Sequence, residues 1–446
     1  MDKKMMYALV VVVILVVASV SAYVVLKNDD SDPGEPTVMD NAELKVYGNI
    51  NGDRYLDSRD ATLIQNLIND GKTATEYPLA DANQDGVLDS KDVDVVNAVV
   101  NGESTTIYHI NYHDTNGDGV MDQELVSTKY PVTSTIMTGS TNTALLLYCL
   151  GIVDQVKGAT YSSSSLDKDL FSDSYLDTEK CVKLGTSSSS IAFEDGKAGS
   201  SDVIATQNVT ALVTDWNRTY ITNESTFEEY GVDVIRVSAA AVDAETLTHS
   251  AMLLGLLFQV SERANQYIDL SLEVLNYVED AISGLDNAKV VVSSMTGYLS
   301  SVTSDYTQVV LAAGAEYGIP DVAFGGSTSL KIEDHPEVYT YDFDYIIHVR
   351  SNLNYVQTQE TIDSLWSTYT PAFSDWEHAA DGQYIISGMI PVSLRVAYAA
   401  EILHSDAIDL DKINEYHQQF VNQFFNGKDY DISSLTFIIS SEDVSA

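Results

Sequence analysis

The chain begins with an unbroken apolar run. Residues 5–26 carry no charged side chain, and as a helix they would extend about 33 Å, which is enough to cross a bilayer. Lys3 and Lys4 come before this run and acidic residues follow it, so the positive-inside rule places the short tail in the cytoplasm. We therefore expect residues 1–28 to form a cytoplasmic tail and a single-pass anchor in the cell membrane, with the remaining chain outside the cytoplasm. Removal of the segment by cleavage after Ala22 is the alternative.

A repeated helical pattern follows this run. Residues 29–43 are acidic and contain prolines, which is typical of an exposed linker. Beyond them, the apolar residues Ile64, Leu67 and Ile68 have apolar counterparts 32 residues later, at the three- and four-residue spacing of a helix with one apolar face. We expect two short helices that pack these faces together in a small all-α module over residues 44–103.

The remaining chain alternates strand-like and helix-like patterns. Alternating apolar residues on either side of Asn116 predict a β-hairpin, and from about residue 134 short β-branched runs alternate with longer helical stretches, which indicates an α/β fold. Apolar residues recur at helical spacing through residues 253–285, so we predict one long helix that joins two α/β lobes beside a ligand-binding cleft. A core helix inside a single large domain is the alternative. The predicted strands are 202–205, 232–236, 289–292 and 345–349, and the predicted units are the N-terminal lobe 104–250, the linking helix 251–286 and the C-terminal lobe 287–446.

The overall charge narrows the range of functions. The 446 residues include 23 Lys and Arg against 66 Asp and Glu, a formal net charge of −43, which repels phosphate backbones and excludes nucleic acid as a favourable partner. A highly anionic solute would be repelled in the same way, so a weakly charged or cationic ligand fits better. The two cysteines, Cys149 and Cys181, are too few for a disulfide framework, and we expect two buried thiols.

Two loops before the predicted helices carry oxygen side chains at matching positions. Segments 49–60 and 81–92 align residue for residue at an offset of 32, with side-chain oxygens at loop positions 1, 3, 5, 9 and 12. Position 7 is left to offer its backbone carbonyl. Ca²⁺ prefers six to eight oxygen ligands of this kind, so we predict two calcium sites. The ligand positions are Asn49, Asn51, Asp53, Tyr55, Asp57 and Asp60 in the first loop, and Asp81, Asn83, Asp85, Val87, Asp89 and Asp92 in the second.

These loop-then-helix units, with no helix before either loop, resemble a type I dockerin over about residues 46–102. The resemblance implies calcium-dependent folding and docking to a cohesin, with loop positions 10 and 11 taking part in recognition. Those positions are Ser58 and Arg59 in the first loop, and Ser90 and Lys91 in the second. Their near identity implies a docking face that is usable in two orientations. The alternative is a module that calcium stabilises but that has no cohesin partner.

Two departures from the dockerin pattern weaken the first loop. Asn49 replaces the usual leading aspartate, and Arg54 stands where a glycine would relieve a positive φ, at a cost of about 1 kcal/mol. We therefore expect the first loop to bind calcium more weakly than the second. A third segment, 114–122, begins in the same way but has Leu125 where the last carboxylate is needed, so we expect a hairpin around Asn116 without bound calcium.

The order of elements over residues 104–430 resembles the helix-linked solute-binding proteins of ABC importers for iron-siderophore, haem and cobalamin. Residues 136–160 are similar to the family's first strand, first helix and second strand, and residues 381–403 to its last strand and C-terminal helix. The resemblance implies a two-lobed protein, not an enzyme, that captures a metal chelate or corrinoid and delivers it to the importer permease. In the family, one acidic residue on each lobe contacts permease arginines, and here these would be Glu194 and Glu337.

Loops that follow strands should line the cleft, and four residues are candidates there. Arg350 ends an apolar strand and can pair with a ligand carboxylate or phosphate. A salt bridge to one of the many acidic residues is its alternative role. The other candidates for ligand binding are Asn142, Tyr161 and Tyr298.

Two other classes of function stay open. Dockerins often accompany glycoside hydrolases, and a catalytic carboxylate pair could be present among so many acids. The sequence contains no nucleophile elbow, HExxH motif or phosphate-binding glycine loop, which argues against an enzyme. A surface adhesion or scaffold protein is the other alternative, and it would present a large apolar patch instead of a cleft.

Overall fold

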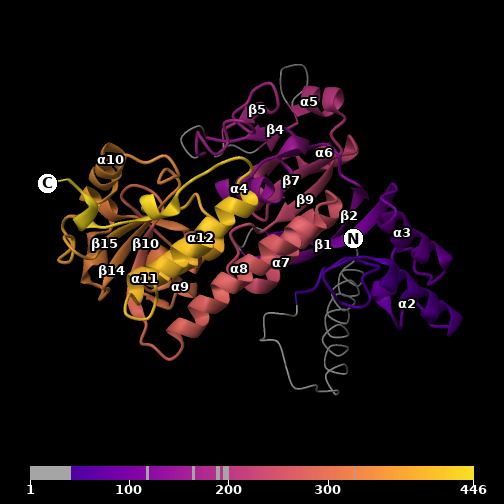
Figure 1. Ribbon diagram of the computed structural model, residues 1–446, viewed down its shortest axis with the longest axis horizontal. Helices are drawn as coiled ribbons and strands as arrows, with labels where there is room; N and C mark the ends of the chain where they lie inside the picture. The colour runs from indigo at the N-terminus through magenta and orange to yellow at the C-terminus, as the bar shows by residue number, and fades with distance from the viewer. Residues whose placement is uncertain are drawn as a thin grey trace.

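The computed structural model describes residues 42–116, 120–162, 166–186, 191–193, 200–325 and 327–445. The predicted membrane anchor, most of the predicted linker and Glu194 lie outside these residues. Within the described ranges, no helix is both long enough and apolar enough to cross a membrane. Figure 1 shows two α/β lobes beside each other, with a small helical module at the far side of the first lobe.

The small module is built from the two predicted helices. Each helix begins with a capping box in which the side chain of the N-cap aspartate and that of the third helical residue bond reciprocally to the backbone. Ile64 and Val96 are fully buried between the helices, as predicted. Val100, expected on the same buried face, is instead exposed because it is the last residue of its helix. The elements are α2 (Ser58–Asn69), the 3-10 helix Pro78–Ala80 and α3 (Ser90–Val100).

A β-hairpin leads from the module into the N-terminal lobe. Its strands, β1 (Thr105–His113) and β2 (Asp122–Tyr130), pair antiparallel over their full length, which confirms the predicted hairpin. The lobe itself contains a parallel five-stranded sheet, whose spatial order is β5 (Val182–Gly185), β4 (Val156–Thr160), β3 (Thr135–Met137), β7 (Ala211–Asp215) and β9 (Asp233–Val237). The lobe also contains α4 (Thr141–Cys149), α6 (Glu224–Glu229) and the short pair β6 (Ile191–Ala192) and β8 (Ile221–Thr222).

One predicted strand of this lobe is a helix. The run 202–205 belongs to α5 (Ser200–Gln207), so the strand prediction was wrong. Val203 and Ile204 are adjacent and both buried, while Asp202 is exposed. In this helix, Val203 and Ile204 both face the core while Asp202 faces the solvent.

The C-terminal lobe repeats the α/β architecture. Its strands β10 (Ala288–Ser293) and β14 (Tyr345–Arg350) contain the predicted strands 289–292 and 345–349. The five-stranded sheet has the spatial order β12 (Ala315–Tyr317), β10 (Ala288–Ser293), β14 (Tyr345–Arg350), β15 (Gln383–Ser387) and β16 (Ile438–Ile439), with only β16 antiparallel. The lobe also contains α9 (Asp305–Ala312), α10 (Gln359–Tyr369), α11 (Val392–Leu403), α12 (Leu410–Phe424) and the pair β11 (Tyr298–Ser300) and β13 (Ser329–Lys331).

The connection between the lobes is two helices, not the single helix predicted over residues 253–285. α7 (Ala244–Leu257) ends within the N-terminal lobe, and α8 (Ser261–Ile282) then runs from that lobe to the C-terminal lobe beside α12 (Figure 1). The break occurs where Gln259 has a φ of +58°, a left-handed conformation that interrupts a right-handed helix. Apolar periodicity continues across the break, which is why the sequence pattern suggested one helix.

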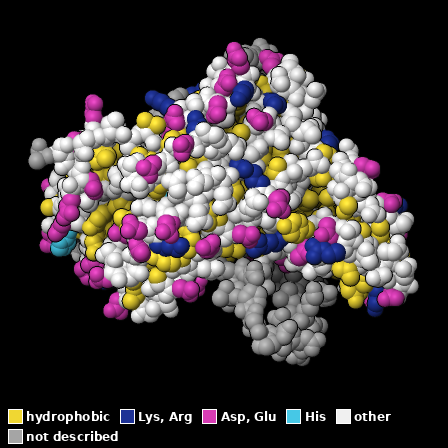
Figure 2. Space-filling model, viewed as in Figure 1, with side chains coloured by type: hydrophobic (Ala, Val, Ile, Leu, Met, Phe, Trp, Pro, Cys, Tyr) yellow, Lys and Arg dark blue, Asp and Glu magenta, His cyan; other side chains and the backbone are white. Residues whose placement is uncertain are grey.

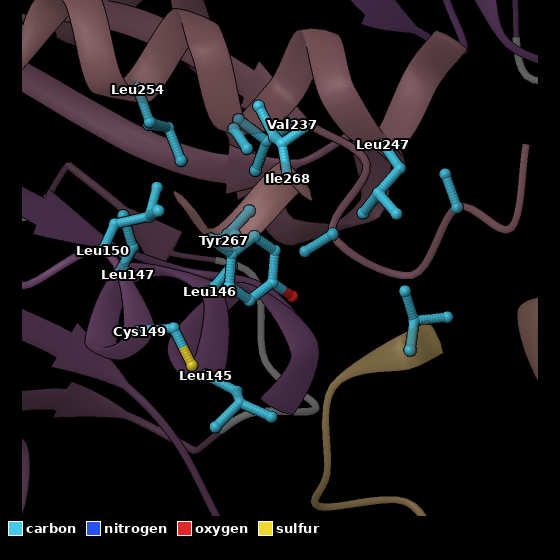
Figure 3. Close-up of a cluster of buried hydrophobic side chains, with 14 of the residues drawn as sticks. Leu145, Leu146, Leu147, Cys149, Leu150, Val237, Leu247, Leu254, Tyr267 and Ile268 are labelled. Carbon is cyan, nitrogen blue, oxygen red and sulfur yellow. The ribbon is translucent and has the colours of Figure 1, made fainter. Parts of the chain in front are cut away.

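A continuous hydrophobic core extends from the module through the N-terminal lobe to α8 and α12. Figure 3 shows its central part, where Leu146 of α4 lies close to Tyr267 and Ile268 of α8. Cys149 belongs to the same cluster. Both Cys149 and Cys181 are buried free thiols, as predicted, and burial raises the pKa of each to about 12. They are therefore protonated and unreactive at neutral pH.

Gly255 allows α7 and α8 to approach closely at their junction. A Cβ atom at this position would lie 2.6 Å from the Cβ of Ala264 and 3.1 Å from the Cα of Ser261. We expect Gly255→Ala to lower the free energy of unfolding by about 1–3 kcal/mol through overpacking, although alanine favours helix. Chemical denaturation measures the change. Gly185→Ala is the control, because its Cβ would meet nothing nearer than 3.6 Å; equal midpoints for the two variants would contradict the close contact.

Candidate functional site

The two lobes face each other across a group of buried polar side chains. In the N-terminal lobe, β7 ends at Asp215, whose carboxylate accepts hydrogen bonds from Ser140 Oγ (3.0 Å) and from the Asn217 backbone N–H (3.4 Å). In the C-terminal lobe, α9 begins at Asp305. Burial, together with the negative charge of Asp305, raises the pKa of Asp215 to about 7. The two carboxyl groups therefore interact across the boundary between the lobes.

An arginine joins the lobes at the same place. Arg395 of α11 is fully buried, donates from Nη2 to Oδ1 of Asn142 in α4, and donates from Nε to the Ile390 carbonyl (3.1 Å). Burial raises the pKa of Asp305, and the positive charge of Arg395 opposes this shift. Asn142, predicted as a ligand residue, thus lies in the interlobe group, where it contacts the opposite lobe.

Arg350, at the end of β14, is the second buried arginine of the C-terminal lobe. It donates from Nη1 to the Ser293 carbonyl (2.5 Å) and from Nη2 to Ser293 Oγ (3.0 Å), and its guanidinium lies 4.2 Å from the ring centroid of Tyr369. Its Nε is buried without a hydrogen-bond partner, and burial lowers its pKa to about 10. Its hydrogen-bond acceptors among the described residues are the carbonyls of Ser293 and Val349 and the Ser293 hydroxyl, and none of them is a carboxylate. The salt bridge considered as its alternative role is therefore not formed in this part of the chain.

The two predicted tyrosines occupy different surroundings. Tyr161 follows β4 and is buried, with the Lys183 ammonium 4.6 Å from its ring centroid. Tyr298 is half-buried in β11, where it pairs with Lys331 of β13. Within the described residues, no hydrogen bond or ring contact of either tyrosine reaches Asp215 or Arg350. Their role in ligand binding stays a prediction.

Sequence reasoning missed Asp215, Asp305 and Arg395. One signal was available for Asp215, because the apolar run 211–213 is followed two residues later by this carboxylate, as a buried strand ending at a site is. Asp305 and Arg395 lie inside helical patterns and become part of the site only when the lobes meet.

Glu337, predicted to contact the permease, is exposed in a 3-10 helix (Pro336–Thr340) of the C-terminal lobe. Its carboxylate accepts from His335 Nδ1 (3.0 Å), and this hydrogen bond lowers the pKa of Glu337. An exposed, ionised carboxylate can meet an arginine of another protein. The matching residue on the first lobe, Glu194, lies outside the described residues.

The second calcium loop brings its carboxylates around its own backbone. Asp81, at position 1, accepts from the N–H groups of Asp85 (3.2 Å) and Gly86 (2.9 Å). Asp92, at position 12, is buried and accepts from the N–H groups of Asn83 (3.2 Å) and Asp89 (2.9 Å). The side chains at the first and last ligand positions thus hydrogen-bond to the loop backbone and stabilise its conformation. Its all-oxygen donor set suits a hard cation.

The first loop repeats this arrangement with a neutral leading residue. Asn49 donates from Nδ2 to the carbonyls of Leu44 and Asp53 (2.8 Å each), while its Oδ1 is buried without a hydrogen-bond partner. Asp60 is fully buried and accepts from three backbone N–H groups of the loop. An orphaned buried oxygen among such carboxylates fits a calcium ligand.

The expected strain at Arg54 is absent. Arg54 does not adopt a positive φ; the first loop places its positive φ at Gly52 (+67°), whereas the second loop places it at Gln84 (+56°) and Gly86 (+83°). A glycine therefore occupies the only left-handed position of the first loop, and Arg54 carries no backbone penalty. The neutral Asn49 remains the reason to expect weaker calcium binding there.

The predicted cohesin-docking residues are all exposed. Arg59 forms ion pairs with Asp53 (2.8 Å) and Asp57 (2.7 Å), and Lys91 forms one with Asp85 (2.7 Å). Each basic side chain is thus paired with carboxylates of its own calcium loop. Ser58 and Ser90 begin α2 and α3. The third loop-like segment forms the turn region of the hairpin, where Asp122 accepts from the Thr115 N–H (3.3 Å); residues 117–119 lie outside the described residues.

Comparisons with known proteins agree with these two parts of the chain. Residues 47–101 match the dockerin type I domain. No curated protein sequence matches the chain. Among solved structures, the chain is similar to the TroA-like periplasmic binding protein FepB from Veillonella parvula, with 15% identity and a TM-score of 0.55 over 71% of this chain and 97% of that chain.

Two further structures share this likeness. CeuE from Helicobacter pylori, solved in a Ni-His complex, has 13% identity and a TM-score of 0.50 over 73% of this chain and 98% of that chain. The molybdate periplasmic binding protein MolA of a Haemophilus influenzae ABC transporter, solved with molybdate, has 9% identity and a TM-score of 0.52 over 69% of this chain and 96% of that chain.

Identities this low establish the fold alone. FepB and MolA are both named as periplasmic binding proteins, which agrees with the resemblance drawn from the order of elements. Residues 47–101 thus match the dockerin type I domain, and the two joined lobes have the fold of TroA-like periplasmic binding proteins.

Proposed function

We propose that this chain is an extracytoplasmic solute-binding protein that holds its ligand between the two lobes and delivers it to the permease of an ABC importer. The observation that carries the proposal is Arg350, a buried guanidinium at the carboxyl end of a parallel strand with no carboxylate partner among the described residues. A buried charge is costly unless a counter-charge meets it, and a ligand would supply one. The fold favours this function over the enzyme and adhesion alternatives.

The proposed ligand is a metal chelate, such as an iron-siderophore or haem, or a corrinoid. Arg350 would donate to a carboxylate or phosphate of the ligand, and the Asp215–Asp305 pair would accept from its hydrogen-bond donors. Figure 2 shows acidic side chains spread over the whole visible face. Their combined field would repel a strongly anionic solute at long range, so a chelate of low or positive overall charge is favoured.

The helix between the lobes limits how the site can open. Because α8 packs on both α7 and α11, the lobes can rock about it but cannot separate widely. The membrane anchor predicted at residues 1–28 would keep the protein near the importer, and Glu194 and Glu337 would meet the permease. A modest opening then releases the ligand toward the permease.

The dockerin-like module would add a second attachment. Ser58, Arg59, Ser90 and Lys91 would contact a cohesin-bearing partner, with calcium in both loops. The exposure of all four side chains supports this role. The partner would hold the solute-binding protein beside the other proteins that the cohesin-bearing partner carries outside the cytoplasm.

The function is tested by a thermal-shift screen of the full chain against ferric siderophores, haem and cobalamin. A ligand present at 100 times its dissociation constant, and bound only by the folded state, adds about 2.7 kcal/mol of stability. A clear rise in melting temperature with one compound is expected and names the ligand class. No shift with any of them would count against a chelate or corrinoid ligand.

Arg350→Gln is expected to weaken binding of the compound found in that screen by about 100-fold, because the charge-assisted hydrogen bonds to the ligand are lost. Isothermal titration calorimetry measures the affinity. Arg218→Gln is the matched control, because Arg218 is exposed and lies outside the interlobe group. Equal affinities for the two variants would place the ligand elsewhere.

A further inference from the structure

The calcium module is joined to the solute-binding lobes by backbone hydrogen bonds. Residues 44–47 (the extra strand) lie antiparallel beside β1 and form an isolated β-bridge between Val46 and His109. Tyr47 donates to the Tyr108 carbonyl (2.9 Å), and Ile110 donates to the Lys45 carbonyl (3.3 Å). Leu44 and Val46 are buried in the core that continues into the N-terminal lobe. The module is therefore part of this lobe's packing.

His249 of α7 fixes this extra strand. It is fully buried, accepts from the Lys45 N–H at Nδ1 (3.3 Å) and donates to the Ile110 carbonyl from Nε2 (2.9 Å). Burial lowers its pKa to about 4, so the ring is neutral and each nitrogen has one role. Lys45 adds an ion pair with Glu245 of the same helix.

Two contacts tie the module to the junction between α7 and α8. The Tyr130 hydroxyl donates to the Val99 carbonyl in α3 (3.1 Å) and accepts from Gln259 Nε2 (3.2 Å), the residue at which the helices break. Arg54, in the first calcium loop, pairs with Asp269 of α8. The contacts thus reach the helix that connects the lobes.

The first calcium loop is bonded directly to the strand that joins the lobe. Asn49, at the leading ligand position, donates to the Leu44 carbonyl (2.8 Å), and Leu44 in turn donates to the Asp53 carbonyl (3.1 Å). A cation bound to Asn49 Oδ1 would orient this side chain. The same side chain would then hold residues 44–47 against β1.

From these contacts we propose that calcium binding to the module is coupled to the stability of the solute-binding lobes. Calcium is then a structural ligand of the N-terminal lobe and of the α7–α8 junction as well as of the dockerin-like module. The coupling concerns the chain without solute and therefore stands independently of the ligand proposed above.

The three tryptophans provide a selective probe, because Trp216, Trp366 and Trp376 all lie in the lobes and none lies in the module. Thermal unfolding of the full chain, followed by tryptophan fluorescence, reports the lobes alone. We expect the midpoint to rise by about 3–5 °C between excess chelator and saturating calcium. Equal concentrations of magnesium control for general screening of the acidic surface.

Two double variants and one control variant separate this coupling from other effects of calcium. Asp60→Asn with Asp92→Asn, which alters both loops, should abolish the calcium-dependent shift. Tyr130→Phe with Asp269→Asn leaves every loop ligand in place. This variant should still bind calcium in calorimetry but show about half of the calcium-dependent shift. Glu279→Gln, on the exposed face of α8, is the control and should leave the shift unchanged. A tryptophan midpoint that does not respond to calcium in a chain that binds calcium would overturn the proposal.

Discussion

Replacing Asp215 by asparagine is expected to stabilise the protein at pH 8 and to reduce the pH dependence of its free energy of unfolding between pH 4 and pH 7. The folded-state pKa of Asp215 is raised to about 7 by burial and by the charge of Asp305, whereas an unfolded aspartate titrates near pH 3.9. A carboxyl group with a raised folded-state pKa contributes its full stability below the pKa of the unfolded state. This contribution is lost as the pH rises through the folded-state pKa. Asparagine keeps the hydrogen-bond acceptor for Ser140 but carries no charge.

The size of this effect follows from the shift. A difference of about 3 pKa units, at roughly 1.4 kcal/mol each, corresponds to about 4 kcal/mol at pH 8. Urea denaturation at pH 5 and pH 8 measures it in the wild-type protein and the variant. Asp286→Asn, at an exposed loop position, controls for the general relief of negative charge. If the two variants show the same pH dependence, Asp215 is not the titrating group.

Phe420→Ala is expected to lower the free energy of unfolding by about 3–5 kcal/mol, the usual cost of removing a buried phenylalanine ring. Phe420 lies on α12 and is fully buried. Its ring packs edge-to-face with Tyr267 on α8 and tilted against Phe424, with centroid separations of 5.7 Å each. Removing the ring opens a cavity where the connecting helix meets the C-terminal lobe. Chemical denaturation measures the loss.

Leu410→Ala, at the exposed start of the same helix, provides the comparison and should change stability by less than about 1 kcal/mol. A similar loss in both variants would mean that α12 frays as a whole. A small loss in Phe420→Ala alone would mean that the packing of α8 on α12 contributes little to joining the lobes.

Local patterns in the sequence predicted the elements whose environment is local. The repeated calcium loops and their helices, the hairpin, and the strands β9, β10 and β14 follow from spacing, because each buries a face that its own residues define. The prediction of one linking helix was wrong because the left-handed Gln259 interrupts the backbone without interrupting the apolar repeat. The prediction of a strand at 202–205 was wrong because two adjacent buried residues suit either a helix or a fully buried strand.

The site was less accessible to sequence reasoning, because it forms between elements far apart in the chain. Arg350 and Asn142 were candidates because loops after strands were expected to line the cleft, and their role in ligand binding stays a prediction. The hydrogen-bond partner of Asn142 is Arg395, 253 residues away, which no local pattern indicates. The carboxyl groups of Asp215 and Asp305 affect each other's pKa only when the lobes place them together. Spacing along one strand or helix carries no information about such a pair.

The extra strand formed by residues 44–47 leaves no flexible tether between the module and the lobes. For a protein attached through a flexible linker, the local concentration of its binding site around the attachment point is set by linker length and falls as the linker grows. Here the interlobe site is held at one distance and one orientation from the module. A partner that binds the module would therefore also fix the position and orientation of the interlobe site. Another protein could reach this site only if it lies where that fixed orientation points.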